Sequence, residues 1–294
     1  MKKVLVTGAA GRVGRDVVLG LLQAGHGVVA VDIAWPERPE GNHSELVTAT
    51  LDVTDRSGLA EVAQGCDAIV HLAGVPRPLP DTPEVSFGTN VMAAFAAYQV
   101  AADLGIARVV AASSASALGR AWAERPEEPL YFPIDEAHPL RAADHYALAK
   151  GTVERIGQSF SRETGLTAIA LRFPWVSIDE MLLDRVALAN ADPTGGVWFR
   201  DIWSYVRPDD LASAFVAAIA ADAATTTVNI VAPDTLMEAP TETLLRQYFP
   251  SVEIREPIIG NEPAWSSAHA RNVLGFSPLT SWRDLQTLSV ERVN

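Results

Sequence analysis

The sequence predicts an α/β protein built on a doubly wound parallel sheet, with a small C-terminal substrate-binding region. Two observations predict this fold class. Short β-branched runs alternate with amphipathic stretches up to residue 172, and a glycine-rich turn directly follows the first run. Strands that alternate with helices form right-handed βαβ units, whose strands pair in parallel. At 294 residues the chain is long enough for one large domain with a small appended region.

The first βαβ unit is predicted within the first 32 residues. Residues 3–7 form a short apolar run typical of a buried strand, and residues 13–24 carry apolar side chains at helical spacing. Gly25 and Gly27 end that helix, and residues 28–32 form the second strand. The same alternation then predicts strands at 46–51, 68–72, 108–112 and 167–172, and helices at 56–64, 84–105 and 144–164.

The pattern changes after Pro174. Five of the seven tryptophans lie beyond this point, and the strand–helix alternation is lost. Only a helix at 208–221 and a strand at 227–231 are predicted there. We therefore expect a dinucleotide-binding domain over residues 1–174 and a small substrate-binding region over 175–294, with residues 206–231 returning to the core of the first domain.

Composition excludes several classes of partner. The formal net charge is −13, which disfavours binding to nucleic acid and to anionic membranes. The apolar run after the N-terminal Met-Lys-Lys is too short for a signal peptide, and no apolar stretch approaches the roughly 20 residues needed to span a bilayer. Cys66 is the single cysteine, so no intrachain disulfide is possible. A cytoplasmic location and no metal site are expected.

A cofactor motif is predicted at residues 7–14, TGAAGRVG, between the first strand and the first helix. Its three glycines allow a tight turn and a close approach to a pyrophosphate, and the helix N-terminus offers backbone N–H donors. This setting is typical of Rossmann dinucleotide-binding domains. Asp32 ends the second strand, where a carboxylate binds ribose hydroxyls and favours NAD over NADP. Arg12 and Arg38 are the alternative, because they could hold a 2′-phosphate.

Further motifs follow along the chain. They are Asp52-Val53, His71-Leu72-Ala73-Gly74, Asn90, SSASALG at 113–119, Tyr146-Ala147-Leu148-Ala149-Lys150, Leu171-Arg172-Phe173-Pro174 and RPDDLA at 207–212. With TGAAGRVG they resemble the extended short-chain dehydrogenases/reductases, the NAD-dependent epimerase/dehydratase family. Two positions depart from that pattern: Leu118 replaces a tyrosine, and Val206-Arg207-Pro208 replaces VHV-Asp.

The resemblance implies an NAD site and a catalytic set. The implied cofactor-binding residues are Gly8, Ala10, Gly11, Arg12, Val13, Gly14, Asp32, Asp52, Val53, Leu72, Ala73, Gly74, Asn90, Ala112, Tyr146, Lys150, Phe173 and Pro174. The implied catalytic residues are Ser114, Tyr146, Lys150 and the supporting Asn90.

The chemistry of these residue types fits proton and hydride transfer. Tyr146 and Lys150 lie four apart, on one face of a helix. A neighbouring ammonium favours the phenolate, so Tyr146 can take a proton from a substrate hydroxyl. Ser114 would hold the substrate oxygen, and Ser113 is not assigned this role.

The substrate class is expected to be a sugar or sugar acid. Only about three dozen residues separate Arg172 from Asp210, which is short for an enzyme that holds a nucleotide sugar. In the spacing of Arg200 and Asp210 the chain is similar to the uronate dehydrogenases of the family, in which an arginine near this position binds the sugar carboxylate. Ser114, Ser116, Arg200 and Trp175 are the candidate substrate-binding residues.

Two alternatives stay open at the level of sequence. The first is a nucleotide-sugar epimerase or dehydratase with tightly bound NAD, and the second is a non-catalytic dinucleotide-sensing protein. A homodimer through the helices at 84–105 and 144–164 is expected in each case. The alanines in these helices (Ala93, Ala94, Ala96, Ala97, Ala147 and Ala149) would permit close helix approach.

Overall fold

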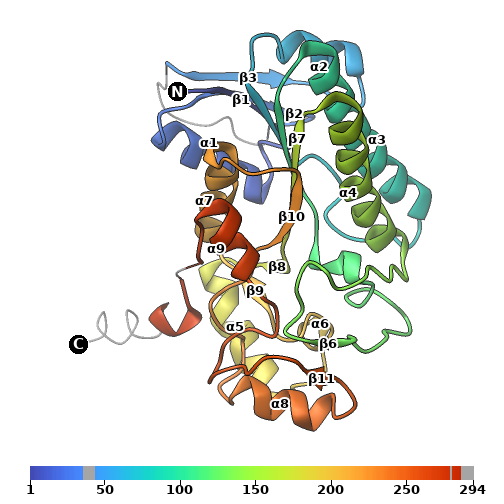
Figure 1. The fold of residues 1–294 in the computed structure, drawn as a ribbon, viewed down its shortest axis with the longest axis vertical. Coiled ribbons are helices and arrows are strands. Elements are labelled where there is room, and N and C mark those ends of the chain that lie inside the picture. The colour runs from blue at the N-terminus through green and yellow to red at the C-terminus, as the bar shows by residue number, and fades with distance from the viewer. Residues whose placement is uncertain (36–43, 279, 286–294) are drawn as a thin grey trace.

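A seven-stranded parallel sheet forms the centre of the molecule (Figure 1). The computed structural model describes residues 1–35, 44–278 and 280–285. The strand order is β10-β7-β5-β4-β1-β2-β3, so the chain winds outward from β1 in both directions. This is the doubly wound order of a Rossmann fold, and the predicted fold class is confirmed.

The strands of this sheet agree with the predicted ones to within one or two residues at each end. They are β1 (Lys3–Thr7), β2 (Gly27–Asp32), β3 (Leu46–Thr50), β4 (Ala68–His71), β5 (Arg108–Ala112), β7 (Thr167–Arg172) and β10 (Thr226–Asn229). Side chains alternate between the two faces of the sheet, so Val4 and Val6 contact one apolar cluster and Leu5 the other. Both faces are covered, which explains why the inner strands β1, β2, β4 and β5 are almost continuously apolar, whereas the edge strands β3 and β10 carry two threonines each.

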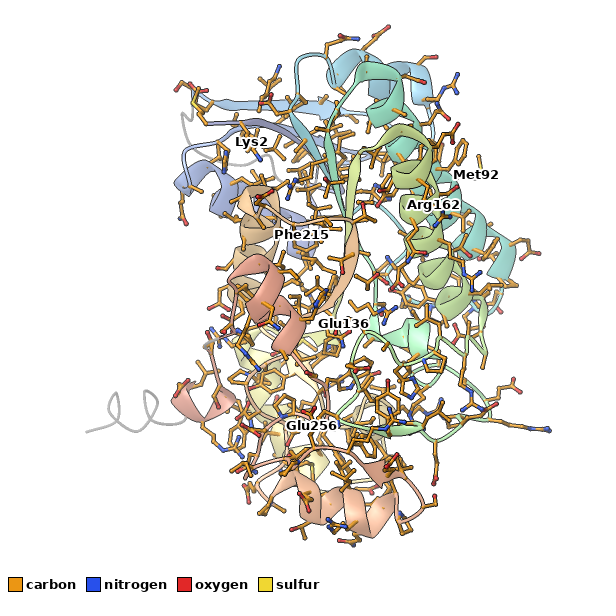
Figure 2. The ribbon with its side chains drawn as sticks, viewed as in Figure 1. Lys2, Met92, Glu136, Arg162, Phe215 and Glu256 are labelled. Atoms are coloured by element: carbon orange, nitrogen blue, oxygen red, sulfur yellow. The ribbon has the colours of Figure 1, made fainter. Side chains whose placement is uncertain are left out.

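Two helical layers cover the sheet (Figure 1). One layer contains α2 (Arg56–Val62), α3 (Pro83–Leu104) and α4 (His145–Thr164), and the other contains α1 (Arg12–Gln23), α7 (Pro208–Ala220) and α9 (Ala268–Leu274). In Figure 2, Phe215 marks α7, and its ring is fully buried in the cluster formed with α1. None of the described helices is long and apolar enough to cross a membrane.

The last third of the chain does not form one continuous unit. Because β10 pairs with β7 and α7 packs against α1, residues 206–231 contribute to the main sheet and its covering layer. The remaining segments lie below the sheet (Figure 1). They comprise β8 (Trp175–Val176), α5 (Asp179–Ala191), α6 (Val197–Arg200), β9 (Tyr205–Val206), α8 (Thr241–Tyr248) and β11 (Glu253–Ile254), together with two elements from the middle of the chain, η1 (Ala115–Leu118) and β6 (Tyr131–Phe132).

A third apolar cluster holds these segments together. Its largest members include Phe132, Trp203, Phe249, Trp265 and Trp282, all buried. Residues from both sides of Pro174 enter this cluster, so the predicted division at residue 174 stays a prediction. The tryptophans Trp203, Trp265 and Trp282 are core residues, and Trp175 is only partly buried.

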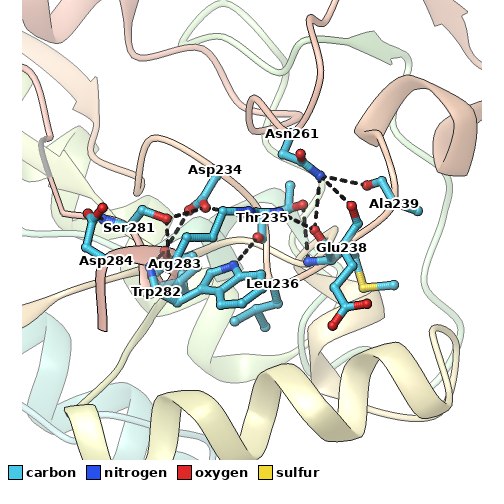
Figure 3. Close-up of polar contacts among 12 residues, drawn as sticks. Asp234, Thr235, Leu236, Glu238, Ala239, Asn261, Ser281, Trp282, Arg283 and Asp284 are labelled. Carbon is cyan, nitrogen blue, oxygen red and sulfur yellow. Dashed lines mark hydrogen bonds and ion pairs between the residues drawn. The ribbon is translucent and has the colours of Figure 1, made fainter. Parts of the chain in front are cut away.

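A hydrogen-bond network fixes the end of the described chain (Figure 3). The carboxylate of Asp234 accepts from the hydroxyls of Tyr205 and Ser281, both at 2.6 Å, and from Arg283. The indole nitrogen of Trp282 donates to the carbonyl of Thr235 at 2.8 Å. Since these groups are buried or partly buried, the network fixes residues 281–283 against the segments below the sheet.

Candidate active site

The glycine-rich loop between β1 and α1 is closely packed. Gly8 has φ +70°, and a Cβ there would lie 2.6 Å from the amide nitrogen of Ala73. A Cβ on Gly14 would lie 2.1 Å from the carbonyl oxygen of Gly8, and one on Gly11 would lie 3.2 Å from it. The loop therefore presents its backbone directly at the N-terminus of α1, which is the cradle that a pyrophosphate requires.

Asp32 borders this loop, and Asp52 follows β3. Oδ2 of Asp32, at the end of β2, accepts from the backbone N–H of Ala10 at 2.9 Å, so the carboxylate is held beside the loop. Oδ1 of Asp52 accepts from the backbone N–H and the hydroxyl of Thr54, which lowers the pKa of Asp52. Val53 beside it is buried. Arg38 lies outside the described residues.

Asn90 holds the segment after β4. Its side chain accepts from the backbone N–H of Val75 at 2.7 Å and donates to the carbonyl of the same residue at 3.1 Å. Gly74 lies directly against it, since a Cβ on Gly74 would be 2.4 Å from Oδ1 of Asn90. This pair of bonds fixes the Leu72–Gly74 turn beside Gly8. Asn90 thus holds the backbone at Gly74 and Val75.

Tyr146, Lys150 and Ser114 come together at the carboxyl end of β5. Asp144 caps α4 by accepting from the backbone N–H groups of Tyr146 and Ala147, which fixes Tyr146 in the first helical turn. Nζ of Lys150 donates to the carbonyl of Ala112 at 2.9 Å and lies 5.8 Å from the ring centroid of Tyr146. The hydroxyls of Ser114 and Tyr146 are hydrogen-bonded to each other.

The two neighbouring serines have different surroundings. Ser114 caps the short helix η1, and its Oγ accepts from the backbone N–H of Ser116 at 3.1 Å. The hydroxyl of Ser113 instead donates to Oε1 of Glu154 at 2.6 Å. Glu154 also forms a bidentate ion pair with Arg172, at 2.7 Å for both bonds. Ser113 therefore belongs to a buried ion-pair network, whereas Ser114 faces Tyr146. Ser114, Tyr146 and Lys150 form the triad of the candidate site.

Burial sets the charge states of the triad. It raises the pKa of Tyr146 to about 12, against a lowering contribution from the hydrogen bond with Ser114. It lowers the pKa of Lys150 to about 8, although the charge of Glu154 raises it. Burial also lowers the pKa of His71 to about 3. At neutral pH the site thus presents a phenol and an ammonium, and His71 is a neutral packing residue bonded to Thr7.

The segment after β7 lies beside the loop that follows β5, which contains Ser113, Ser114 and Ser116. The carbonyl of Phe173 accepts from the backbone N–H of Ala115 at 3.0 Å, and Trp175 begins β8, which pairs with β9. Nη1 of Arg12 donates to the carbonyl of Val176 at 3.2 Å. These contacts bring three segments close together: the glycine-rich loop at residues 7–14, the loop at residues 113–119 and the segment at residues 173–176.

Three charged residues near these segments were not predicted from the sequence: Arg120, Arg185 and Asp201. Arg120 is buried and donates from Nε to the carbonyl of Arg200 at 3.2 Å. The guanidinium carbon of Arg185 lies 3.8 Å from the ring centroid of Trp175. Nη1 of Arg200 donates to the carbonyl of Ala123 at 2.8 Å, so one of its donors is occupied by the backbone. The signal in the sequence for Arg185 and Asp201 was the grouping of arginines and tryptophans between Pro174 and Trp203, a stretch that does not include Arg120.

The fold and the site define a dinucleotide-dependent enzyme. A family model for the NAD-dependent epimerase/dehydratase family matches residues 4–177, which include the glycine-rich loop and the triad. The chain belongs to this family, and its cofactor is NAD. The residues present fit that cofactor, because a Cβ at Gly8 or Gly14 would fill the loop and Asp32 stands beside it.

Named relatives and solved structures agree with this assignment. The uronate dehydrogenase of Pseudomonas syringae pv. tomato is 29% identical over 199 residues, which cover 62% of this chain and 68% of the relative. The L-arabinose 1-dehydrogenase (NAD(P)(+)) of Haloferax volcanii is 33% identical over 181 residues, covering 60% and 68%. A short-chain dehydrogenase/reductase superfamily protein from Agrobacterium tumefaciens, solved with bound NAD, superposes with a TM-score of 0.70 at 23% identity, covering 99% and 100%.

The close packing of Gly8 gives a first prediction. Gly8→Ala should abolish NAD binding and lower the melting temperature, because the new Cβ meets Ala73 as well as an unfavourable backbone conformation. Gly25→Ala is a matched control, since Gly25 has φ +78° with open space around it. Thermal shift with and without NAD measures both effects. Equal destabilisation of the two variants, with NAD binding retained in both, would contradict the proposed cradle.

Proposed function

We propose that this chain is an NAD-dependent dehydrogenase that oxidises a hydroxyl of a sugar or sugar acid. The observation that carries the proposal is the contact of Ser114, Tyr146 and Lys150 beside the cofactor loop. The relatives named uronate dehydrogenase and L-arabinose 1-dehydrogenase support a free sugar as the substrate class.

The proposed mechanism follows from these side chains. Ser114 donates to the substrate hydroxyl oxygen and places it beside Tyr146. Tyr146 takes the hydroxyl proton as the C–H hydride leaves the same carbon, so the alcohol becomes a carbonyl or, at an anomeric carbon, a lactone. NAD, held at the glycine-rich loop beside Asp32, would supply the hydride acceptor. Lys150, held by the carbonyl of Ala112, would favour the phenolate form that Tyr146 must adopt before it accepts the proton, and it could bind the nicotinamide ribose.

The experiment mixes purified protein and NAD with a panel of free sugars, uronic acids and nucleotide sugars and follows reduced nicotinamide by absorbance. A rise with a free sugar or uronate is the expected result. Conversion of a nucleotide sugar without net reduction would replace the proposal by the epimerase or dehydratase alternative, which the family description favours next. No turnover, with NAD bound, would point to the dinucleotide-sensing alternative.

We also propose a homodimer through the outer faces of α3 and α4. The alanines named above do not form this face, because all six are buried within the chain, where they let the two helices pack closely on each other and on the sheet. The outer face instead exposes Val85, Met92, Phe95 and Leu148, at 54%, 55%, 42% and 52%. Figure 2 shows Met92 at the edge of the molecule. Exposed apolar side chains grouped on two adjacent helices are typical of an interface.

This proposal predicts a monomeric variant. Leu148→Glu should convert the protein from dimer to monomer in analytical ultracentrifugation, because it places a charge within the apolar face. Ile259→Glu is the control, since Ile259 is 68% exposed and lies outside both helices, so it should leave the dimer intact. Wild-type protein that sediments as a monomer at micromolar concentration would refute the proposal.

A further inference from the structure

Arg120 is a buried cation that forms no ion pair with the described residues. It is 5% exposed, and its hydrogen bonds go to backbone carbonyls: Nε donates to that of Arg200 at 3.2 Å, and Nη1 donates to that of Glu127. Burial lowers the pKa of Arg120 to about 10, although the charges of Asp201 and Glu128 raise it, so the guanidinium stays cationic at neutral pH. Burying a cation without an ion pair costs free energy, which indicates a role beyond stability.

The contact between Arg120 and Arg200 is reciprocal. Nη1 of Arg200 donates to the carbonyl of Ala123 at 2.8 Å, and Ala123 lies three residues after Arg120. Together the two bonds restrain both the backbone and the guanidinium of Arg200 against residues 120–123. Nε and Nη2 of Arg200 have no hydrogen-bond partner among the described residues, so they stay available to a substrate group.

The helix that carries Arg200 depends on such contacts. α6 has four residues, none of them buried, and a helix this short is held by tertiary packing rather than by its own hydrogen bonds. Arg200 is its last residue, so its carbonyl is one of those that a helix leaves without a partner inside the helix. An arginine that donates to this carbonyl stabilises the helix end. Arg120 therefore fixes the point from which the side chain of Arg200 extends.

The segment that carries Arg120 continues directly from the triad. Ser114 caps η1, and Gly119, with φ +88°, ends it. A Cβ on Gly119 would lie 1.9 Å from the carbonyl oxygen of Arg141, so this segment packs closely on the loop that leads to Tyr146 in α4. The backbone of Arg120 is thus fixed relative to the two loops that carry Ser114 and Tyr146.

We infer that Arg120 is a positioning residue for substrate binding, which fixes the guanidinium of Arg200 relative to Ser114 and Tyr146. The inference rests on the proposed function and on the prediction from sequence that Arg200 binds a substrate carboxylate. Arg120 acts through Arg200 and does not touch the substrate, because the carbonyls and the ring of Phe249, whose centroid is 5.3 Å away, surround its guanidinium. A guanidinium held in place loses less conformational freedom when it binds a ligand.

The test measures binding of galacturonate and galactose to the NADH-loaded protein by titration calorimetry. Arg120→Met should weaken binding of galacturonate by about tenfold, because the freed side chain of Arg200 must then be ordered on binding. Binding of galactose and of NADH should change little, since neither depends on the orientation of Arg200.

Arg108→Met is the matched control. Arg108 is also partly buried and donates to a backbone carbonyl, that of Ala218, at 2.6 Å. It begins β5, whose opposite end leads to Ser114. Arg108→Met should lower the melting temperature and leave the dissociation constant of galacturonate unchanged.

A double-variant cycle separates positioning from a general loss of structure. Arg200→Met should weaken binding of galacturonate at least as much as Arg120→Met does, and Arg120→Met should have no further effect when Arg200 is already Met. Arg120→Lys keeps the buried cation but lacks the planar fork that reaches two carbonyls, so it should lose affinity several-fold. This variant provides the test if Arg120→Met does not fold.

Four outcomes would overturn the inference. They are additive losses in the cycle, equal losses for galactose and galacturonate in Arg120→Met, wild-type affinity for galacturonate in either Arg120 variant, and wild type that binds no galacturonate. Formation of NADH judges the proposed function separately. Oxidation of a neutral sugar without binding of galacturonate would overturn only the inference. Galacturonate binding that depends on Arg120, without turnover of any sugar, would refute only the dehydrogenase.

Discussion

Tyr146→Phe is expected to lower kcat for sugar oxidation by about 10²–10⁴-fold, the usual contribution of a positioned general base. The substitution removes only the hydroxyl that is bonded to Ser114, and the ring stays buried at the start of α4. The dissociation constant for NAD should change little, because the glycine loop and Asp32 are untouched. Steady-state kinetics and fluorescence titration with NADH measure the two effects.

The pH profile separates a chemical role of Tyr146 from a structural one. Burial holds the pKa of Tyr146 at about 12 in the protein alone, so the base must be favoured by Lys150 and the positively charged nicotinamide ring before it can act. The rate of the wild type should rise with pH as the phenolate becomes accessible, and the residual rate of Tyr146→Phe should lose this rise.

Tyr131→Phe provides the matched control for this variant. It deletes the same hydroxyl from a buried tyrosine of β6, where the group bonds Asp135 at 2.6 Å. Its kcat should stay near that of the wild type. Full activity in Tyr146→Phe would show that another group removes the substrate proton.

Sequence periodicity predicted the main sheet because its strands and helices are long enough to carry a pattern. The helix expected at 144–164 is α4 (His145–Thr164), and Asp144 caps it as its residue type favours. The order of the motifs then predicted which residues would surround the cofactor, since the carboxyl ends of parallel strands meet at one edge of the sheet.

The substrate side could not be predicted in the same way. Its strands β6, β8, β9 and β11 are two residues long, and α6 has four residues, so none of them carries a period. Arg120 and Arg200 lie on separate segments, and only tertiary packing brings the side chain of Arg120 to the carbonyl of Arg200. The choice of Arg200 relied on spacing along the chain, which does not reveal that the backbone of Ala123 occupies one of its donors.

Substitution of Glu154 is expected to have the second large effect, on both the free energy of unfolding and the pH dependence of activity. Glu154→Leu should lower the free energy of unfolding by about 3–5 kcal/mol, because it leaves the buried guanidinium of Arg172 without its bidentate partner. Arg172→Leu should cost a similar amount. The double variant should cost less than the sum of the two, since no unpaired charge then stays buried. Additive losses in urea unfolding would contradict this coupling.

The pH profile of activity distinguishes the role of Glu154 from that of Arg172. Burial lowers the pKa of Lys150 to about 8, and the charge of Glu154 opposes this lowering. The ammonium is therefore present below pH 8 and lost as the pH rises through that value. Removing Glu154 lowers the pKa of Lys150 further, so the loss of activity on the alkaline side should begin at lower pH in Glu154→Leu. Arg172→Leu keeps the carboxylate and should show no such downward shift. Identical pH profiles in the two variants would mean that Glu154 acts on stability alone, whereas a shift confined to Glu154→Leu would make it the positioning residue that keeps Lys150 charged.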